Sequence, residues 1–85
     1  MEEITSLEGP VEMIEGKLTL LVPLAAGGDQ LVDCSRGIAT VEGEFLKVII
    51  QDWLAAKLGI YEGRLVVIDN RNGKFNISPS PMHPN

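Results

Sequence analysis

The chain has 85 residues, 45% of them hydrophobic, and a formal net charge of −5 at pH 7. This length predicts one small domain, and the apolar content is too high for a chain that stays disordered. The acidic balance disfavours nucleic-acid binding, which depends on neutralising phosphates, unless basic side chains gather locally.

Cysteine usage and hydropathy indicate a cytoplasmic protein. A single cysteine, Cys34, excludes an intrachain disulfide framework and is typical of a reducing compartment. No apolar run reaches the roughly 18 residues that a membrane-spanning helix needs. The acidic start of the sequence also lacks the pattern of a signal peptide. We therefore expect no association with a membrane.

The first strand is expected after a polar N-terminal stretch. Residues 1–10 end in the turn signal Gly9-Pro10 and are predicted to be a flexible segment. From residue 18 to residue 24 every second residue is leucine or valine, which is strand periodicity with one apolar face. Pro23 cannot donate to a sheet ladder, so it is expected to mark the end or the edge of this strand.

The middle of the chain is less regular. Residues 25–28 are Ala-Ala-Gly-Gly and are predicted to form a loop. Residues 29–37 fit either one helical turn or a short strand, and the helical or irregular turn is favoured. Strand character returns over residues 38–50, where the even-numbered residues from 46 to 50 would share one apolar face.

A short helix is the clearest local prediction, at about residues 52–58. Asp52 can accept hydrogen bonds from the first free amides, and the residues after it are mostly good helix formers. Gly59 supplies a left-handed stop. Leu54 and Leu58 lie one turn apart and would face the sheet. Because so short a helix is marginal in water, packing must hold it.

A tight hairpin is predicted around Asn72-Gly73, because these residues tolerate the two positive φ angles of a type I′ turn. One face of the hairpin would then be apolar core, and the tip of the other face would be solvated. The predicted cross-strand pairs are Arg71–Lys74, Asn70–Phe75, Asp69–Asn76 and Ile68–Ile77.

Together these elements predict an α+β fold, a small and mostly antiparallel β-barrel-like sheet with one short helix. Residues 11–78 would form the single domain. Residues 79–85 contain three prolines and are predicted to be a disordered tail. The pattern of an apolar residue, Glu-Gly and a polar residue occurs three times, starting at residues 14, 41 and 61. Either chance or internal duplication explains these short matches.

No pattern indicates catalysis, a metal site or a cofactor, so a protein that is not an enzyme is expected. Cys34 lies beside a hydroxyl and a guanidinium in "DCSR", neighbours that can lower the pKa of a thiol. A cysteine nucleophile also needs a base, and the single histidine, His83, lies in the proline-rich tail. A half-buried structural thiol is therefore favoured. One cysteine and one distant histidine give no metal-ligand cluster.

Two sets of side chains are candidates for contacts with partners. Arg64, Arg71 and Lys74 surround the hairpin and would contact DNA if DNA is bound, although solvated strand ends are the simpler interpretation. Trp53 either packs within the protein or its dimer, or anchors a foreign partner, since aromatic residues are enriched at interface hot spots. The candidate residues for a partner or dimer interface are Trp53, Leu54, Phe45 and Phe75.

Residues 39–77 carry a succession of motifs. In chain order, these motifs are a turn into an apolar strand, a short helix ending Leu-Gly-Ile, a strand with alternating apolar residues and a hairpin. The positions that match are Leu54, Leu58, Gly59 and Ile60, then Gly63, Leu65 and Val67, then Gly73, Lys74, Phe75 and Ile77. This succession resembles the AbrB/MazE/SpoVT-like swapped-hairpin family of small bacterial regulators. The resemblance implies a homodimer built by interleaved hairpins, with DNA contacts made by basic residues.

Two departures from the family pattern affect the expected function. Glu44 stands where the family has an arginine after the turn glycine, and Gln51 replaces the usual proline. Because glutamate repels phosphate, DNA binding is not carried over. The first hypothesis is a non-catalytic regulatory or antitoxin-like module, homodimeric because so small a domain needs a covering layer. The second is an acidic protein-interaction or adaptor module, and the third is a small barrel that binds a ligand.

Overall fold

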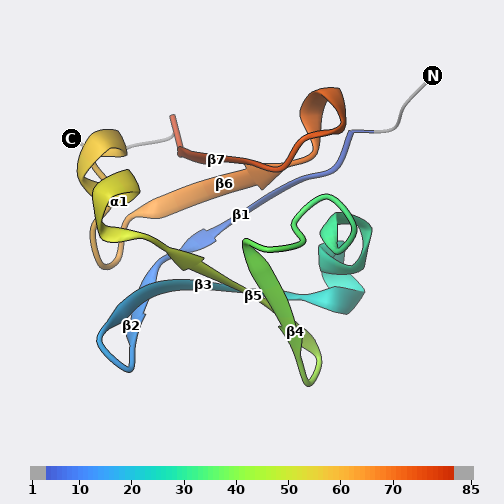
Figure 1. The fold of residues 1–85 in the computed structure, drawn as a ribbon, viewed down its shortest axis with the longest axis horizontal. Coiled ribbons are helices and arrows are strands. Elements are labelled where there is room, and N and C mark those ends of the chain that lie inside the picture. Colours follow the sequence, from blue (N-terminus) through green and yellow to red (C-terminus); the bar gives the residue numbers. More distant parts are fainter. Residues whose placement is uncertain (1–3, 82–85) are drawn as a thin grey trace.

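The computed structural model describes residues 4–81 and confirms a small α+β domain. The strands of this range form two antiparallel sheets, one of three strands in the order β1-β6-β7 and one of four in the order β2-β3-β5-β4 (Figure 1). The sheets are not closed into a barrel, so the predicted barrel-like closure stays a prediction. The elements are β1 Ser6–Pro10, β2 Glu12–Ile14, β3 Lys17–Pro23, β4 Ala39–Glu42, β5 Phe45–Ile50, α1 Asp52–Leu58, β6 Leu65–Asp69 and β7 Asn76–Pro79.

Only Val11 separates β1 from β2, so the chain passes from one sheet to the other at this residue. Val11 is buried, its N–H donates to the Arg64 carbonyl at 3.0 Å, and its carbonyl accepts from the Gly63 N–H at 2.8 Å. Because these bonds continue the pairing of β1 with β6, the N-terminal stretch holds the two sheets together.

The prediction that residues 1–10 form a flexible segment is wrong for Ser6–Pro10, which forms a strand paired along its whole length with β6. Its partner lies more than fifty residues later in the sequence, so local composition does not reveal the pairing. At the other end Pro79 belongs to β7, and Ser80 is buried with its N–H bonded to the Leu65 carbonyl at 2.9 Å. The predictions for residues 1–3 and 82–85 lie outside the described residues.

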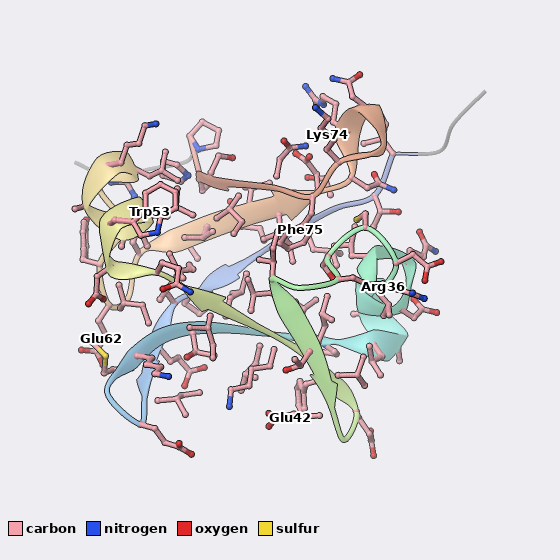
Figure 2. All side chains as sticks on the ribbon, in the orientation of Figure 1. Arg36, Glu42, Trp53, Glu62, Lys74 and Phe75 are labelled. Atoms are coloured by element: carbon pink, nitrogen blue, oxygen red, sulfur yellow. The ribbon has the colours of Figure 1, made fainter. Side chains whose placement is uncertain are left out.

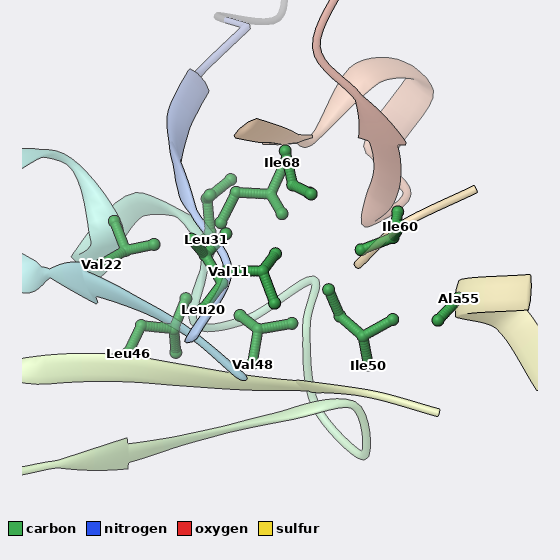
Figure 3. Packing of buried hydrophobic residues seen from close by; sticks show 11 residues of the cluster. Val11, Leu20, Val22, Leu31, Leu46, Val48, Ile50, Ala55, Ile60 and Ile68 are labelled. Atoms are coloured by element: carbon green, nitrogen blue, oxygen red, sulfur yellow. The ribbon is translucent and has the colours of Figure 1, made fainter. Parts of the chain in front are cut away.

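The apolar core is built from alternate residues of the inner strands and confirms the predicted strand faces. β3 supplies Leu20 and Val22, β5 supplies three residues, and β6 supplies two (Figure 3). Residues i and i+2 of a strand lie on the same face, so each strand inserts a row of side chains. The buried apolar residues are Val11, Leu20, Val22, Leu31, Leu46, Val48, Ile50, Ala55, Ile60, Val66 and Ile68.

Helix α1 has the predicted bounds but begins differently from the expectation. Asp52 is the first helical residue, and no side chain caps the helix start. The helix ends at Gly59, whose φ of 73° is left-handed and whose N–H donates to the Ala55 carbonyl, as expected for a glycine stop. Ala55 is the buried residue of the helix, while Leu54 and Leu58 are half-buried against the core.

The β6–β7 hairpin has the predicted register at two of the four predicted pairs, whereas Asn70–Phe75 and Arg71–Lys74 lie in the loop, outside the strand ladder. Ile68 pairs with Ile77 and Asp69 with Asn76, where the ladder of the two strands stops. Asn72 (φ 61°, ψ 26°) and Gly73 (φ 73°) are both left-handed, as a type I′ turn requires. Two 3-10 turns follow β3, Leu24–Ala26 and Gly28–Leu31. The first lies mostly in the predicted loop 25–28, and the second extends into residues 29–37, where a helical or irregular turn was favoured.

Candidate functional site

An open apolar groove of about 1020 Å³ lies where β7, the end of β5 and the start of α1 meet. The β2–β3 turn and the loop before β4 complete its boundary. Its charged lining residues are Lys17 and Asp52. Its apolar lining includes Ile38, Ile49, Trp53, Leu54, Phe75 and Ile77.

Trp53 is the most exposed large apolar residue of the described chain, with 66% of its surface accessible to solvent. It projects from α1, and Phe75 is seen below β6 and β7 in Figure 2. Both side chains line the groove. Ile38, from the loop before β4, is 48% exposed. The interpretation of Trp53 as a core residue of the single chain is therefore wrong, and a contact outside the chain stays open.

The structure brings together three of the four residues expected at an interface. Trp53 and Leu54, which are neighbours on α1, and Phe75, which comes just before β7, line the groove. Phe45 does not line it. This residue begins β5, is 42% exposed and pairs with Glu42 at the β4–β5 turn.

The three candidate DNA contacts do not form one patch. Arg64 precedes β6 at the α1 end of the sheet, where its Nη1 donates to the Gly59 carbonyl at 3.1 Å and its guanidinium lies 5.7 Å from the centre of the Tyr61 ring. Arg71 and Lys74 lie beyond the other end of β6, exposed at the hairpin tip. Arg64 thus stabilises the helix end, and only two basic residues remain together.

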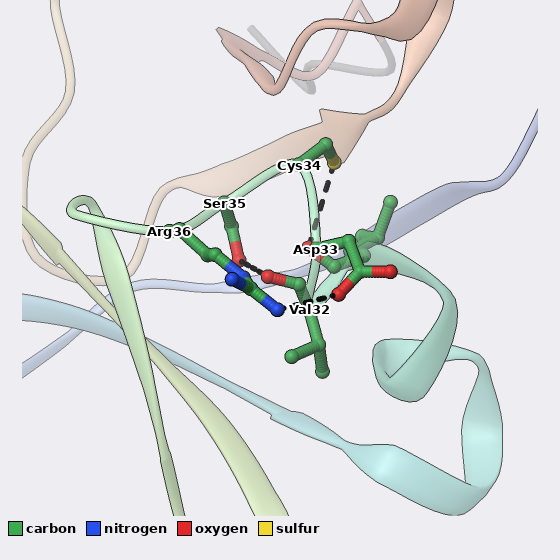
Figure 4. Close-up of polar contacts among 6 residues, drawn as sticks. Val32, Asp33, Cys34, Ser35 and Arg36 are labelled. Carbon is green, nitrogen blue, oxygen red and sulfur yellow. Dashed lines mark hydrogen bonds and ion pairs between the residues drawn. The ribbon is translucent and has the colours of Figure 1, made fainter.

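Cys34 lacks the surroundings of an activated nucleophile. The thiol is half-buried and donates to the Leu31 carbonyl at 3.5 Å (Figure 4). Burial raises the pKa of the Cys34 thiol, and the nearby carboxylates of Asp33 and Asp69 raise it further, against the lowering effect of a backbone hydrogen bond. The Arg36 guanidinium binds Asp33 at 3.3 Å. The guanidinium, a group that can lower the pKa of a thiol, therefore interacts with a carboxylate, and the half-buried thiol agrees with the favoured structural role.

Within residues 4–81 no three histidine, cysteine, aspartate or glutamate side chains are grouped so that they could hold a metal ion. His83 lies outside this range. The described part of the chain also has no helix of the length and apolarity needed to span a bilayer. Comparisons with protein-family models, with curated proteins and with solved structures gave no match to the chain.

Sequence reasoning missed most of the groove lining, including the apolar residues Ile38, Ile49 and Ile77. Ile49 had a visible signal, because it is an apolar residue on the face of β5 opposite the core face. Ile38 and Ile77 carried none, since their position in the groove depends on how the loop before β4 and the strand β7 approach α1.

Proposed function

We propose that the protein is a non-catalytic protein-interaction module that binds a partner polypeptide in the groove between β7, β5 and α1. The exposure of Trp53 beside this apolar lining supports the proposal most directly. Indole and phenyl rings bury large areas and dominate the energetics of interfaces. An exposed tryptophan in a groove that Phe75 and Ile38 also line is therefore suited to anchor a partner.

A regulatory or antitoxin-like role in a bacterial cytoplasm is compatible with such a module and is supported by the family resemblance. Homodimer formation has the same support. Direct DNA contact is supported less, because Arg64 bonds to the end of α1 and leaves Arg71 and Lys74 on a chain of net charge −5. Glu44 stays exposed in the β4–β5 turn, where it would repel phosphate.

Site-specific photo-crosslinking in cells tests the proposal. A benzophenone amino acid replaces Trp53 in one variant and Glu44 in a matched variant, because both positions are exposed and only position 53 lies in the groove. We expect a protein adduct from position 53 and none from position 44. Absence of an adduct at position 53, or the same adduct from both positions, would contradict a groove-specific partner.

A further inference from the structure

Strand β5 is paired on both sides along only part of its length. β3 pairs with all of Phe45–Ile50, whereas the pairing with β4 ends at Val48 and Ala39. Ile38 would face Ile49 in this register, but its N–H turns away to the Ser35 carbonyl at 2.9 Å. On the β4 side, Ile49 therefore lies beyond the last strand pair.

The hydrogen-bond alternation of antiparallel strands gives the direction of the Ile49 backbone. The Leu24 N–H donates to the Glu44 carbonyl at 2.9 Å, one step beyond the Pro23–Phe45 pair. Even-numbered residues of β5 therefore bond to β3, and odd-numbered residues turn their N–H and carbonyl groups to the β4 side. On that side of Ile49 the register places Ile38, and Ile38 and Ile49 both line the groove.

The same reasoning applies to Ile77. Among the strands of residues 4–81, β7 lies at the edge of its sheet and pairs with β6 alone. The Ser80 N–H donates to the Leu65 carbonyl one step beyond the Val66–Pro79 pair, so Ser78 and Asn76 are the residues of β7 that bond to β6. The N–H and carbonyl of Ile77 point away from β6, and Ile77 also lines the groove.

We propose that the groove accepts an extended segment of a partner protein, which adds as a strand and bonds to the backbones of Ile77 and Ile49. This inference rests on the proposed protein-binding function and specifies its mode. Strand addition takes its affinity from main-chain hydrogen bonds and its specificity from alternate side chains. The alternate apolar side chains of the segment would contact Trp53, Phe75 and Ile38.

The net charge of the chain and the backbone polar groups at the two strand edges favour an extended segment of a partner as the occupant of the groove. Because the whole chain has a net charge of −5, a segment with lysine or arginine beside its apolar residues is attracted to it, whereas a second copy of the chain seated in this groove would be repelled. A homodimer formed through another face is compatible with this. A helical partner would satisfy its own backbone and cover the polar groups of Ile49 and Ile77 without bonding to them, which is costly. An extended segment bonds to both.

Amide hydrogen exchange of the free protein, measured residue by residue, tests the two edges. We expect fast exchange at Ile49 and Ile77 and slow exchange at Val48 and Ser78, whose amides belong to ladders. Slow exchange at Ile49 and Ile77, together with a dimeric mass in light scattering, would mean that a second copy occupies the edges. That result would overturn the proposal.

A displayed library of random peptides of about ten residues, long enough for one strand, tests the occupant. Selection on the wild type, with removal of peptides that also bind Trp53→Ala, should enrich apolar residues at every second position with basic residues between them. N-methylation of one backbone nitrogen at a time should then weaken the selected peptide about tenfold at the few nitrogens that bond to Ile77 and Ile49, and much less at the others. Equal effects at every nitrogen would contradict strand pairing.

The peptide selection distinguishes a failure of strand addition from a failure of protein binding in the groove. Peptides with apolar residues spaced by three and four positions would overturn strand addition, while their dependence on Trp53 would keep the groove as a protein-binding site. Enrichment of no Trp53-dependent peptide would count against both. Ile77→Pro removes one edge donor and should weaken binding without affecting the β6 ladder, whereas the matched Ser78→Pro should destabilise the fold.

Discussion

Asp69 and Asn76 lie directly opposite each other where the β6–β7 ladder ends, and the Asn76 Nδ2 donates to Asp69 Oδ1 at 2.9 Å. The same Nδ2 lies 3.2 Å from the Arg71 carbonyl and 3.0 Å from that of Lys74. The Arg71 N–H donates to Asp69 Oδ1 at 3.1 Å. The Asp69–Asn76 pair therefore fixes the hairpin loop to the ends of β6 and β7. β7 borders the groove.

Replacement of Asn76 tests this arrangement. We expect Asn76→Ala to lower the free energy of unfolding by about 1–2 kcal/mol, because it removes the amide that bonds to Asp69 and to the loop carbonyls. Ser78→Ala is a matched control on the same exposed face of β7 and should stay within about 0.5 kcal/mol of the wild type. Urea unfolding followed by circular dichroism measures both, and equal stabilities would contradict the role of Asn76.

Local signals predicted those elements whose structure depends on neighbouring residues. Asn72-Gly73 was sufficient for the turn and for the two strand pairs nearest the loop, and Gly59 for the end of the helix. Ser6–Pro10 was not recognised as a strand, because its residues are mostly polar or turn-forming and its pairing with β6 spans most of the chain. Long-range pairing has no local sequence signature here.

The groove was predictable only in part. The aromatic residues Trp53 and Phe75 were recognisable as interface candidates from their type. The free edge at Ile49 depends on the turn at Ser35, which directs Ile38 away from β5 and stops β4 one residue short. Arg64 and Arg71 are close in sequence, but they lie at opposite ends of β6 and are therefore separated in space. Their proximity in sequence alone suggested a single basic patch.

Trp53 should contribute little to the stability of the single chain. We expect Trp53→Ala to change the free energy of unfolding by less than about 0.5 kcal/mol, because the side chain is 66% exposed. Leu46→Ala is the contrasting variant, and it should cost about 2–5 kcal/mol because Leu46 is fully buried. Chemical unfolding compares the two, and a large loss in Trp53→Ala would indicate that the indole serves the fold rather than a partner.

Arg64 and Arg71 should differ in their effect on stability although the sequence groups them. Arg64→Ala removes the bond to the Gly59 carbonyl and the contact with the Tyr61 ring, so we expect a loss of about 1 kcal/mol. Arg71→Ala should stay within about 0.5 kcal/mol, because its side chain is exposed at the hairpin tip. Thermal unfolding of both variants measures the difference, and similar melting temperatures would argue against a structural role of Arg64.

Cys34 should react slowly and should make stability depend on pH in the alkaline range. Burial raises the pKa of this thiol, so at a given pH the folded protein holds less thiolate than the unfolded chain, and alkylation by iodoacetamide should be slower until urea is added. The unfolded chain loses the thiol proton at lower pH, so stability should fall as the pH rises above the ordinary thiol pKa of about 8.5. Cys34→Ala should lack this component. Alkylation of the folded protein as fast as that of the unfolded chain would show an accessible, ordinary thiol.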